Sequence, residues 1–419
     1  MSCFQAVSAQ RTRQSVDTER IRFHEARKSL LMNPLRILHL NSLLTGGGTD
    51  DQCVKLAFGL RQLDQKVWII GPDGREFSKV IRTLGVPFHP APPEGPLKLR
   101  FIAAAAKLIR RERIQIVHGH HGRDIWPTIF AAKFSGVRPK IVLTRHMAKS
   151  PSSWFSQRYM LGQCDALIAV SHFVERVLRD GVYEPDSPEQ ERHARPPVLG
   201  ALAKIHVVHG GIDTDRFHPS NAEAQRREWN LQPEHRAFAV AGGYDLPRGK
   251  GQREFLQAAA RIHTQTPQAR FLIIGRGSMA EVLRSDIERL GLKDKAWLTP
   301  YCQNMPQAMN AIDCLVLPQV GTEAFGLVVL EAFACGKPVI ASALDGIPEA
   351  FGAAGFGQLV KPESVDELAA AMVKWANHPR SSPAEQRALH DKIAKEYSVL
   401  AFGGRMIQHY RRISTHHRP

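Results

Sequence analysis

Short apolar runs alternate with stretches of helical length along most of the chain. In the first half, the expected strands are Leu35–Asn41, Lys66–Gly71, Ile114–Gly119, Lys140–Arg145, Ala166–Ser171 and Ile205–His209. Helical patterns such as Asp50–Leu63 and Ile102–Arg111 separate these strands. Nearly continuous apolar strands joined by helices are typical of a parallel sheet that is covered on both faces. The pattern therefore predicts a doubly wound α/β domain.

The same alternation begins again at Arg236. The expected strands are now Ala237–Ala241, Arg270–Gly275, Lys295–Leu298, Cys314–Leu317 and Pro338–Ala341, with helices that start near Gln252, Met279 and Gly326. Helical patterns at Val365–Asn377, Pro383–Glu396 and Leu400–Ile413 close the chain. The predicted fold class is α/β, with two Rossmann-like domains facing each other. Ligands bind such domains at the carboxyl ends of their strands, so the site is expected in the cleft between them.

Five segments follow from these patterns. We expect a disordered, basic extension at 1–31, an N-terminal Rossmann-like domain at 32–212 and a polar joint at 213–235. A second Rossmann-like domain is expected at 236–397, and residues 398–419 are expected to form a helix that packs back on the N-terminal domain, followed by a tail. An insertion rich in Pro, Glu and Arg, Tyr183–Ala203, is interpreted as a surface loop.

Composition points to a cytoplasmic protein. No apolar run reaches the roughly 20 residues that span a bilayer, and the first 31 residues lack the apolar core of a signal peptide. The six cysteines are scattered, without a CxxC pair or metal-ligand spacing, which indicates reduced core thiols.

The net charge of +16 is concentrated in the N-terminal half. Residues 97 to 149 carry twelve Lys and Arg against two acids, Glu112 and Asp124. Such a field attracts phosphates, whether of nucleic acid, anionic lipid or a phosphorylated substrate; a merely solvated basic face is the alternative. Segments 97–113 and 154–159 combine cations with Leu, Ile and aromatic residues, so they are candidates for contact with an anionic membrane. Packing of the apolar helix face on the sheet is the competing interpretation.

The most specific pattern is Glu323-Ala-Phe-Gly-Leu-Val-Val-Leu-Glu331, followed by a Gly-x-Pro strand entry. Gly326 frees the backbone where a helix begins, so the amides of Phe325, Gly326 and Leu327 are expected to face an anion. The positive end of the helix dipole adds to this attraction, which makes a diphosphate site. Glu331 is suited to accept hydrogen bonds from ribose hydroxyls, while Glu323 is expected to reach the sugar.

In this context the two glutamates resemble the E-x7-E signature of the retaining glycosyltransferases of the family 4 type, which have the GT-B fold. This large family includes lipopolysaccharide-core and phosphatidylinositol mannosyl transferases. The resemblance implies a nucleotide-diphosphate sugar as donor, bound by the C-terminal domain, and an acceptor bound by the N-terminal domain. It also implies that no cofactor and no metal ion is needed.

Two cations resemble the donor-phosphate ligands of this family. Lys250 stands at a helix start, after Ala241-Gly-Gly-Tyr-Asp, and is expected to stabilise the leaving nucleoside diphosphate. Family members often carry Arg where this chain has Gly243, so we expect Arg248 to supply that charge.

Several N-terminal residues resemble the family's acceptor side. Gly46, Gly47 and Gly48 match a glycine-rich loop that approaches the donor phosphate and the acceptor. His146 follows a strand and matches the histidine that contacts the transferred sugar. His120 and His121 are expected to contact the acceptor. A metal site at His118, His120 and His121 is not expected, since no carboxylate or Cys with fitting spacing completes a ligand set.

The predicted function is transfer of a sugar to an envelope glycan or a lipid-linked acceptor, peripherally on the inner face of the cytoplasmic membrane. His146, Lys250 and Glu323 are the predicted catalytic residues. Two alternatives stay open: a sugar-nucleotide epimerase with the same fold, and a basic nucleic-acid-binding protein. Nucleic acid is not expected, because the basic stretch lacks aromatic RNA-reading or helix-turn-helix signatures.

Overall fold

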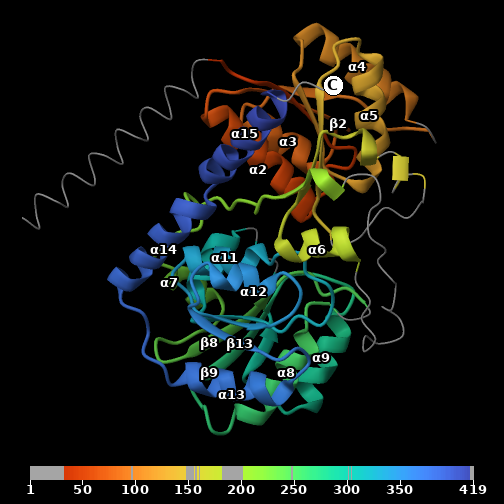
Figure 1. Cartoon of the computed structure of the whole chain (residues 1–419). Helices are drawn as coiled ribbons and strands as arrows, with labels where there is room; N and C mark the ends of the chain where they lie inside the picture. Colours follow the sequence, from red (N-terminus) through yellow and green to blue (C-terminus); the bar gives the residue numbers. More distant parts are fainter. Residues whose placement is uncertain are drawn as a thin grey trace, which may run out of the picture.

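The computed structural model describes two lobes, one above the other in Figure 1. The described residues are 33–95, 98–147, 155, 158–159, 161–181, 202–246, 249–300, 302 and 304–415. The extension predicted at 1–31 lies outside these ranges, as does most of the insertion Tyr183–Ala203. No helix in the described ranges has the length and apolar character that crossing a membrane requires.

The N-terminal lobe is built on a seven-stranded sheet with the order β3-β2-β1-β4-β5-β6-β7. All neighbouring strands run parallel. The strands are β1 (Arg36–Leu40), β2 (Lys66–Gly71), β3 (Phe88–Pro90), β4 (Ile116–Gly119), β5 (Lys140–Arg145), β6 (Ala166–Ala169) and β7 (Ile205–Val207). The helices that cover them are α2 (Gly48–Gln62), α3 (Glu76–Thr83), α4 (Leu99–Glu112), α5 (Ile125–Phe134) and α6 (His172–Asp180). Buried side chains fill both faces of the sheet.

The C-terminal lobe repeats this plan with a six-stranded sheet of order β10-β9-β8-β11-β12-β13. Its strands are β8 (Arg236–Ala241), β9 (Ala269–Ile274), β10 (Ala296–Leu298), β11 (Cys314–Leu317), β12 (Val339–Ser342) and β13 (Gly357–Val360). Its helices are α7 (Glu223–Glu228), α8 (Gln252–Ile262), α9 (Ala280–Arg289), α10 (Met305–Ala311), α11 (Leu327–Ala334), α12 (Ile347–Gly352) and α13 (Val365–Ala376). Two parallel, doubly wound sheets confirm the predicted fold class.

The chain returns to the N-terminal lobe through α14 (Pro383–Tyr397) and α15 (Val399–Thr415), and Figure 1 shows α15, in dark blue, beside α2. Glycines on both helices allow the close approach of α15 to α2. A Cβ atom at Gly59 would lie 2.4 Å from the carbonyl oxygen of Val399, and one at Gly403 would lie 3.0 Å from the carbonyl carbon of Gly59. Phe402, Met406 and Tyr410 of α15 are buried in the N-terminal core.

The segment 213–235 differs from the polar joint that its composition predicts. Phe217, Trp229 and Leu231 are buried in the core of the C-terminal lobe, next to residues of β8 and α11. A backbone turn, in which the carbonyl of Asp213 accepts from the amide of Phe217, precedes the first of these side chains. The amides of Trp229 and Leu231 donate to carbonyls of α7. The segment therefore packs as part of the C-terminal lobe.

Helix α4 uses its apolar face inside the protein. Phe101, Ile102 and Ile109 are buried against β1, β2 and β4. These side chains are therefore covered by the sheet, and the face that α4 presents to solvent carries cations such as Lys107. Of the two interpretations of 97–113, packing on the sheet accounts for these buried apolar positions, whereas Leu99 is exposed.

Tyr410 ties α15 to the N-terminal sheet through a buried hydrogen bond. Its hydroxyl lies 2.6 Å from Nδ1 of His118, and both side chains are fully buried. We expect Tyr410→Phe to lower the free energy of unfolding by about 1–3 kcal/mol, because it leaves a buried nitrogen of His118 without this partner. Urea denaturation measures the change, with Tyr159→Phe as the control at an exposed tyrosine. Equal midpoints for the two variants would contradict the expected role of this hydrogen bond.

Candidate active site

A cavity of about 560 Å³ lies between the two lobes at the carboxyl ends of their strands. It is lined from both lobes, as expected for a GT-B cleft. Eight of the predicted site residues line it: Gly48, His146, Lys250, Glu323, Phe325, Gly326, Leu327 and Glu331. Gly46, Gly47, His120 and His121 do not belong to this lining, and Arg248 lies outside the described residues.

The loop before α11 presents backbone amides to the cavity. Gly326 adopts φ 91°, a left-handed conformation that favours glycine, and caps a helix that begins at Leu327. The first amides of a helix have no partner within the helix, so this end is suited to bind an anion. The loop is held from behind, because a Cβ atom at Gly346 would lie only 2.1 Å from the carbonyl oxygen of Ala324. The structure therefore places the predicted diphosphate site at the cavity wall.

Lys250 reaches this loop from the neighbouring strand-to-helix connection. Its Nζ donates to Oε2 of Glu323 at 2.5 Å. Gly242, whose backbone lies beside the Lys250 side chain, adopts φ 141°, a conformation that favours glycine. Gly251 brings the start of α8 against β11: a Cβ atom would lie 1.8 Å from the carbonyl oxygen of Pro318. The two groups predicted to bind diphosphate and sugar thus pair with each other.

Glu331 lies one and a half turns into α11 and is half-buried at the cavity. Burial raises the pKa of its carboxyl to about 7, and the positive charge of Lys55 opposes this shift. Lys55 belongs to α2, so a cation of the N-terminal lobe faces a carboxylate of the C-terminal lobe. The ionised carboxylate is the form that accepts two hydrogen bonds from paired hydroxyls.

This raised pKa predicts that nucleotide affinity depends on pH. The ionised fraction of Glu331 falls from about 90% at pH 8 to about 10% at pH 6, so we expect the dissociation constant to rise nearly tenfold over this range. Glu331→Gln should bind more weakly and remove this pH dependence. Calorimetric titrations at several pH values test the prediction, and a wild-type affinity that does not change between pH 6 and 8 would contradict it.

The raised pKa of Glu331 also affects the stability of the protein without nucleotide. Stability is expected to fall as the pH rises, whereas nucleotide affinity is expected to increase. The pKa of Glu331 is higher in the folded state than its ordinary value of 4.5. Between these two values the folded state binds more protons than the unfolded state, so this group lowers stability as the pH rises from about 4.5 to about 7. The ionised carboxylate of Glu331 therefore lowers the stability of the folded protein, while the same charge is suited to binding ribose hydroxyls.

His146 stands on the N-terminal side of the cavity, at the end of β5. Burial lowers its pKa to about 3, with smaller contributions from His121 and Arg145. Its Nε2 lies 3.4 Å from Nδ1 of His120. The structure thus places a neutral imidazole at the cleft, where it is able to donate or accept a hydrogen bond without carrying charge.

His120 lies beneath His146, not in the cleft. It is 2% exposed, and its Nε2 is 2.8 Å from Nδ1 of His39. Its ring also stacks on His118, with centroids 4.3 Å apart. Direct contact between His120 and an acceptor, as the sequence predicted, does not fit this burial; the side chain supports His146 from below.

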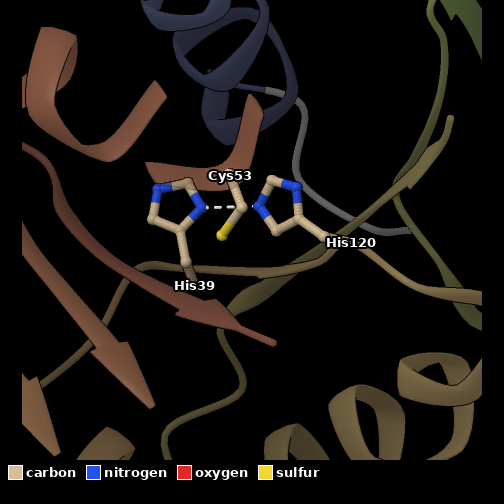
Figure 2. A group of neighbouring side chains, drawn as sticks. All are labelled: His39, Cys53 and His120. Atoms are coloured by element: carbon tan, nitrogen blue, oxygen red, sulfur yellow. Dashed lines mark hydrogen bonds between the residues drawn. The ribbon is translucent and has the colours of Figure 1, made fainter. Parts of the chain in front are cut away.

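Cys53 of α2 completes a cluster with His39 and His120, whose side chains face one another in Figure 2. The spacing of these three residues along the chain does not indicate the cluster. The residues come from β1, α2 and β4, which only the fold brings together. Two nitrogens bound to one tetrahedral zinc ion lie about 3.3 Å apart, so the separation of 2.8 Å between His39 and His120 is that of a hydrogen bond. Burial keeps this group neutral, since it lowers the pKa of His39 to about 3 and raises that of Cys53.

The glycine-rich loop is held by Asp50 in the first turn of α2. Oδ2 of Asp50 accepts from the amide of Gly46 at 2.9 Å, and Oδ1 lies 2.7 Å from Nε2 of His121. Gly47 caps α2 at φ 96°, and Gly48 reaches the cavity. His121 therefore supports the loop through Asp50.

Gln52 is a buried residue at the cavity that sequence reasoning missed. Its Nε2 donates to the carbonyl of Gly211 at 2.8 Å, and its Oε1 accepts from the amide of Gly211 at 2.9 Å. A Cβ atom at Gly210 would lie 2.3 Å from Oε1 of Gln52. Glycine at 210 therefore leaves room for the side chain of Gln52.

Hydrogen bonds also join the two lobes beside the loop 323–326, which precedes α11. Glu349 of α12 accepts from the first amides of α6, those of His172 at 2.8 Å and Phe173 at 2.7 Å. Oγ of Ser171 donates to the carbonyl of Ala324 at 2.6 Å. These contacts fix the loop that carries Glu323 relative to the N-terminal lobe.

Comparison with protein families agrees with this geometry. Residues 46–186 match the model described as Glycosyltransferase Family 4, and residues 222–396 match that of Glycosyl transferases group 1. The chain belongs to the family 4 type of GT-B glycosyltransferases. The predicted resemblance is therefore confirmed over both lobes of the chain.

Curated relatives that the chain resembles are named as glycosyltransferases. The D-inositol 3-phosphate glycosyltransferase of Mycobacterium marinum is 31% identical over 204 residues, 47% of this chain and 42% of that protein. The 2-deoxystreptamine glucosyltransferase of Streptomyces kanamyceticus is 30% identical over 219 residues, 51% of this chain and 56% of that protein. The match thus spans about half the length of these relatives.

Solved structures share the fold over nearly the whole chain. Anabaena HepE in complex with UDP and glucose has a TM-score of 0.70 at 18% identity, covering 90% of this chain and 99% of that chain. A glycosyltransferase from Rickettsia africae has a TM-score of 0.74 at 20% identity, covering 92% and 100%. At these identities the likeness supports the GT-B fold alone.

Proposed function

We propose that this glycosyltransferase moves a sugar from a nucleotide-diphosphate sugar to an acceptor, with retention of the anomeric configuration. One observation carries the proposal: Lys250 and Glu323 pair at the amino end of α11, in a cavity that both lobes line. A cation, free helix amides and a ribose-binding carboxylate together match the charge and the hydroxyls of such a donor.

Each of these groups has a defined task in the proposed reaction. The donor diphosphate takes the place of Glu323 as the partner of Lys250, and the released carboxylate of Glu323 then accepts from hydroxyls of the sugar. As the glycosidic bond breaks, negative charge grows on the diphosphate, where Lys250 and the α11 amides stabilise it. Glu331 holds the ribose, and Arg248 supplies a further positive charge.

The attack takes place on the face from which the diphosphate leaves. The leaving phosphate takes the proton of the acceptor hydroxyl, while neutral His146 holds the sugar from the other lobe. Lys250 and the helix amides balance the diphosphate charge, so we propose that transfer needs neither a metal ion nor another cofactor. Full activity in EDTA is the expected result.

The acceptor is proposed to be an envelope glycan or a lipid-linked molecule, reached from the inner face of the cytoplasmic membrane. Exposed aromatic side chains support a peripheral membrane contact. Trp126, Phe155 and Tyr159 stack in series on the N-terminal lobe, with centroids 5.4 and 5.3 Å apart, and each is more than a third exposed. Aromatic rings near Lys and Arg suit the interface between lipid and water.

A screen of nucleotide sugars tests the proposed activity. UDP-, GDP- and ADP-sugars are added in turn while thermal unfolding is followed, since a ligand that binds the folded state raises the melting temperature. We expect one nucleotide series to stabilise the wild-type protein and to lose this effect in Lys250→Ala and Glu331→Ala. If both variants respond like the wild type, the donor site is elsewhere. Turnover of the nucleotide sugar without any acceptor would instead favour an epimerase.

A further inference from the structure

A second cavity, of about 210 Å³, opens beside the glycine-rich loop of the N-terminal lobe. Arg75, Lys98 and Arg123 line it together with Ser42 and Thr45, and its lining contains no acidic residue. The cations come from the loops after β2 and β4 and from the start of α4, all at the carboxyl edge of the sheet. Ligands bind such sheets at this edge.

Some cations of the N-terminal lobe have structural partners: Arg110 donates to the carbonyls of Phe134 and Ser135, and Lys140 pairs with Asp165. Arg75, Lys98 and Arg123 form no ion pair with a described residue. The acid that acts on Lys98 is the buried carboxyl of Asp124, which accepts from the amide of Ser42 behind the cavity. Three cations against this one carboxyl leave an excess of positive charge, which favours an anion in the cavity.

Lys98 is held toward this cavity in an unusual conformation. Its backbone is left-handed, with φ 50° and ψ 34°, just before α4. Its Nζ donates to Oγ of Ser42 at 3.1 Å and to the carbonyl of Arg123 at 3.1 Å. An ammonium group that donates to two neutral oxygens retains a third donor for an anion. Burial lowers the pKa of Lys98, and the nearby carboxyl of Asp124 opposes this shift.

This second cavity lies next to the larger cavity between the two lobes. Thr45 lines the second cavity, and Gly48, three residues later, lines the larger one. Three extended residues span at most about 10 Å, so an anion and a sugar-accepting hydroxyl on one small molecule are able to occupy both places.

From these observations we infer that the acceptor carries a phosphate group, which Arg75, Lys98 and Arg123 bind beside the glycine-rich loop. This inference rests on the transferase function proposed above and names its acceptor class. The phosphate belongs either to a soluble sugar phosphate or to a lipid headgroup, which offer the same chemistry to the three cations.

Phosphate binding is measured with the donor site blocked. Inorganic phosphate, glycerol 3-phosphate and uncharged glycerol are titrated by calorimetry into the protein saturated with the nucleotide that stabilises it. We expect both phosphates to bind and glycerol not to bind. Lys98→Gln and Arg123→Gln should each weaken phosphate binding about tenfold or more, since each removes a charged hydrogen bond. Lys107→Gln removes one exposed charge from α4 and should leave binding unchanged.

Vesicles separate the two sources of phosphate. If phosphatidylcholine vesicles bind only when they contain phosphatidic acid, and Lys98→Gln weakens this binding while soluble phosphates do not bind, the source is a lipid headgroup. The inference is overturned if the nucleotide binds but no phosphate probe does, or if Lys98→Gln and Arg123→Gln bind like the wild type. Failure of every nucleotide to bind would contradict the proposed function instead.

Discussion

Lys250→Ala is expected to lower kcat for sugar transfer by about 10²–10³-fold, with a smaller rise in KM for the donor. The reason is that negative charge on the diphosphate increases as the glycosidic bond breaks, so Lys250 stabilises the transition state more than the bound substrate. Steady-state kinetics with the nucleotide sugar identified in the screen give both constants.

Two further variants separate the loss of transition-state stabilisation by Lys250 from indirect causes of lower activity. Lys250→Ala leaves the carboxylate of Glu323 without its partner, so a double variant with Glu323→Gln shows whether the unpaired charge causes the loss. Lys293→Ala removes an exposed charge from the same lobe and should keep full activity. A Lys250→Ala enzyme with unchanged kcat would remove this lysine from the reaction.

Glu331→Ala should weaken nucleotide binding by about 10- to 100-fold, because hydrogen bonds between the ribose and a charged carboxylate are lost. The unliganded variant should be at least as stable as the wild type at pH 8, since the wild-type protein keeps a carboxylate half-buried there. Calorimetry measures the first effect and thermal unfolding the second.

The combination of these two results is informative. Weaker binding together with unchanged or higher stability excludes general unfolding as the cause. Glu288→Ala, at an exposed position on α9, is the matched control and should change neither quantity. Equal nucleotide affinity in Glu331→Ala and the wild type would mean that the ribose binds elsewhere.

Periodicity predicted most of the two sheets, since buried parallel strands are apolar runs that differ clearly from their helices. Strand β3, Phe88–Pro90, was missed because it is three residues long and ends in proline. Strand β13 was missed because Gly357–Val360 is short, begins with glycine and is largely half-buried. The polar composition of 213–235 hid the three core residues Phe217, Trp229 and Leu231.

The donor side of the site could be predicted because its residues lie close together in one loop and helix. The pairing of Lys250 with Glu323 could not, since 73 residues separate them and only the order of β8 and β11 brings them together. The same holds for Gln52, whose side chain reaches a backbone group 159 residues away. A local pattern identifies candidate groups, whereas contacts between elements decide which of them meet.

A crystal structure with the nucleotide sugar bound shows whether the amino end of α11 binds the diphosphate. We expect diphosphate oxygens about 3 Å from the amides of Gly326 and Leu327 and from Nζ of Lys250. We also expect ribose hydroxyls on Glu331 and a Glu323 side chain that has turned from Lys250 to the sugar. A nucleotide bound away from the amino end of α11, with the Lys250–Glu323 pair intact, would mean that this donor site is wrong.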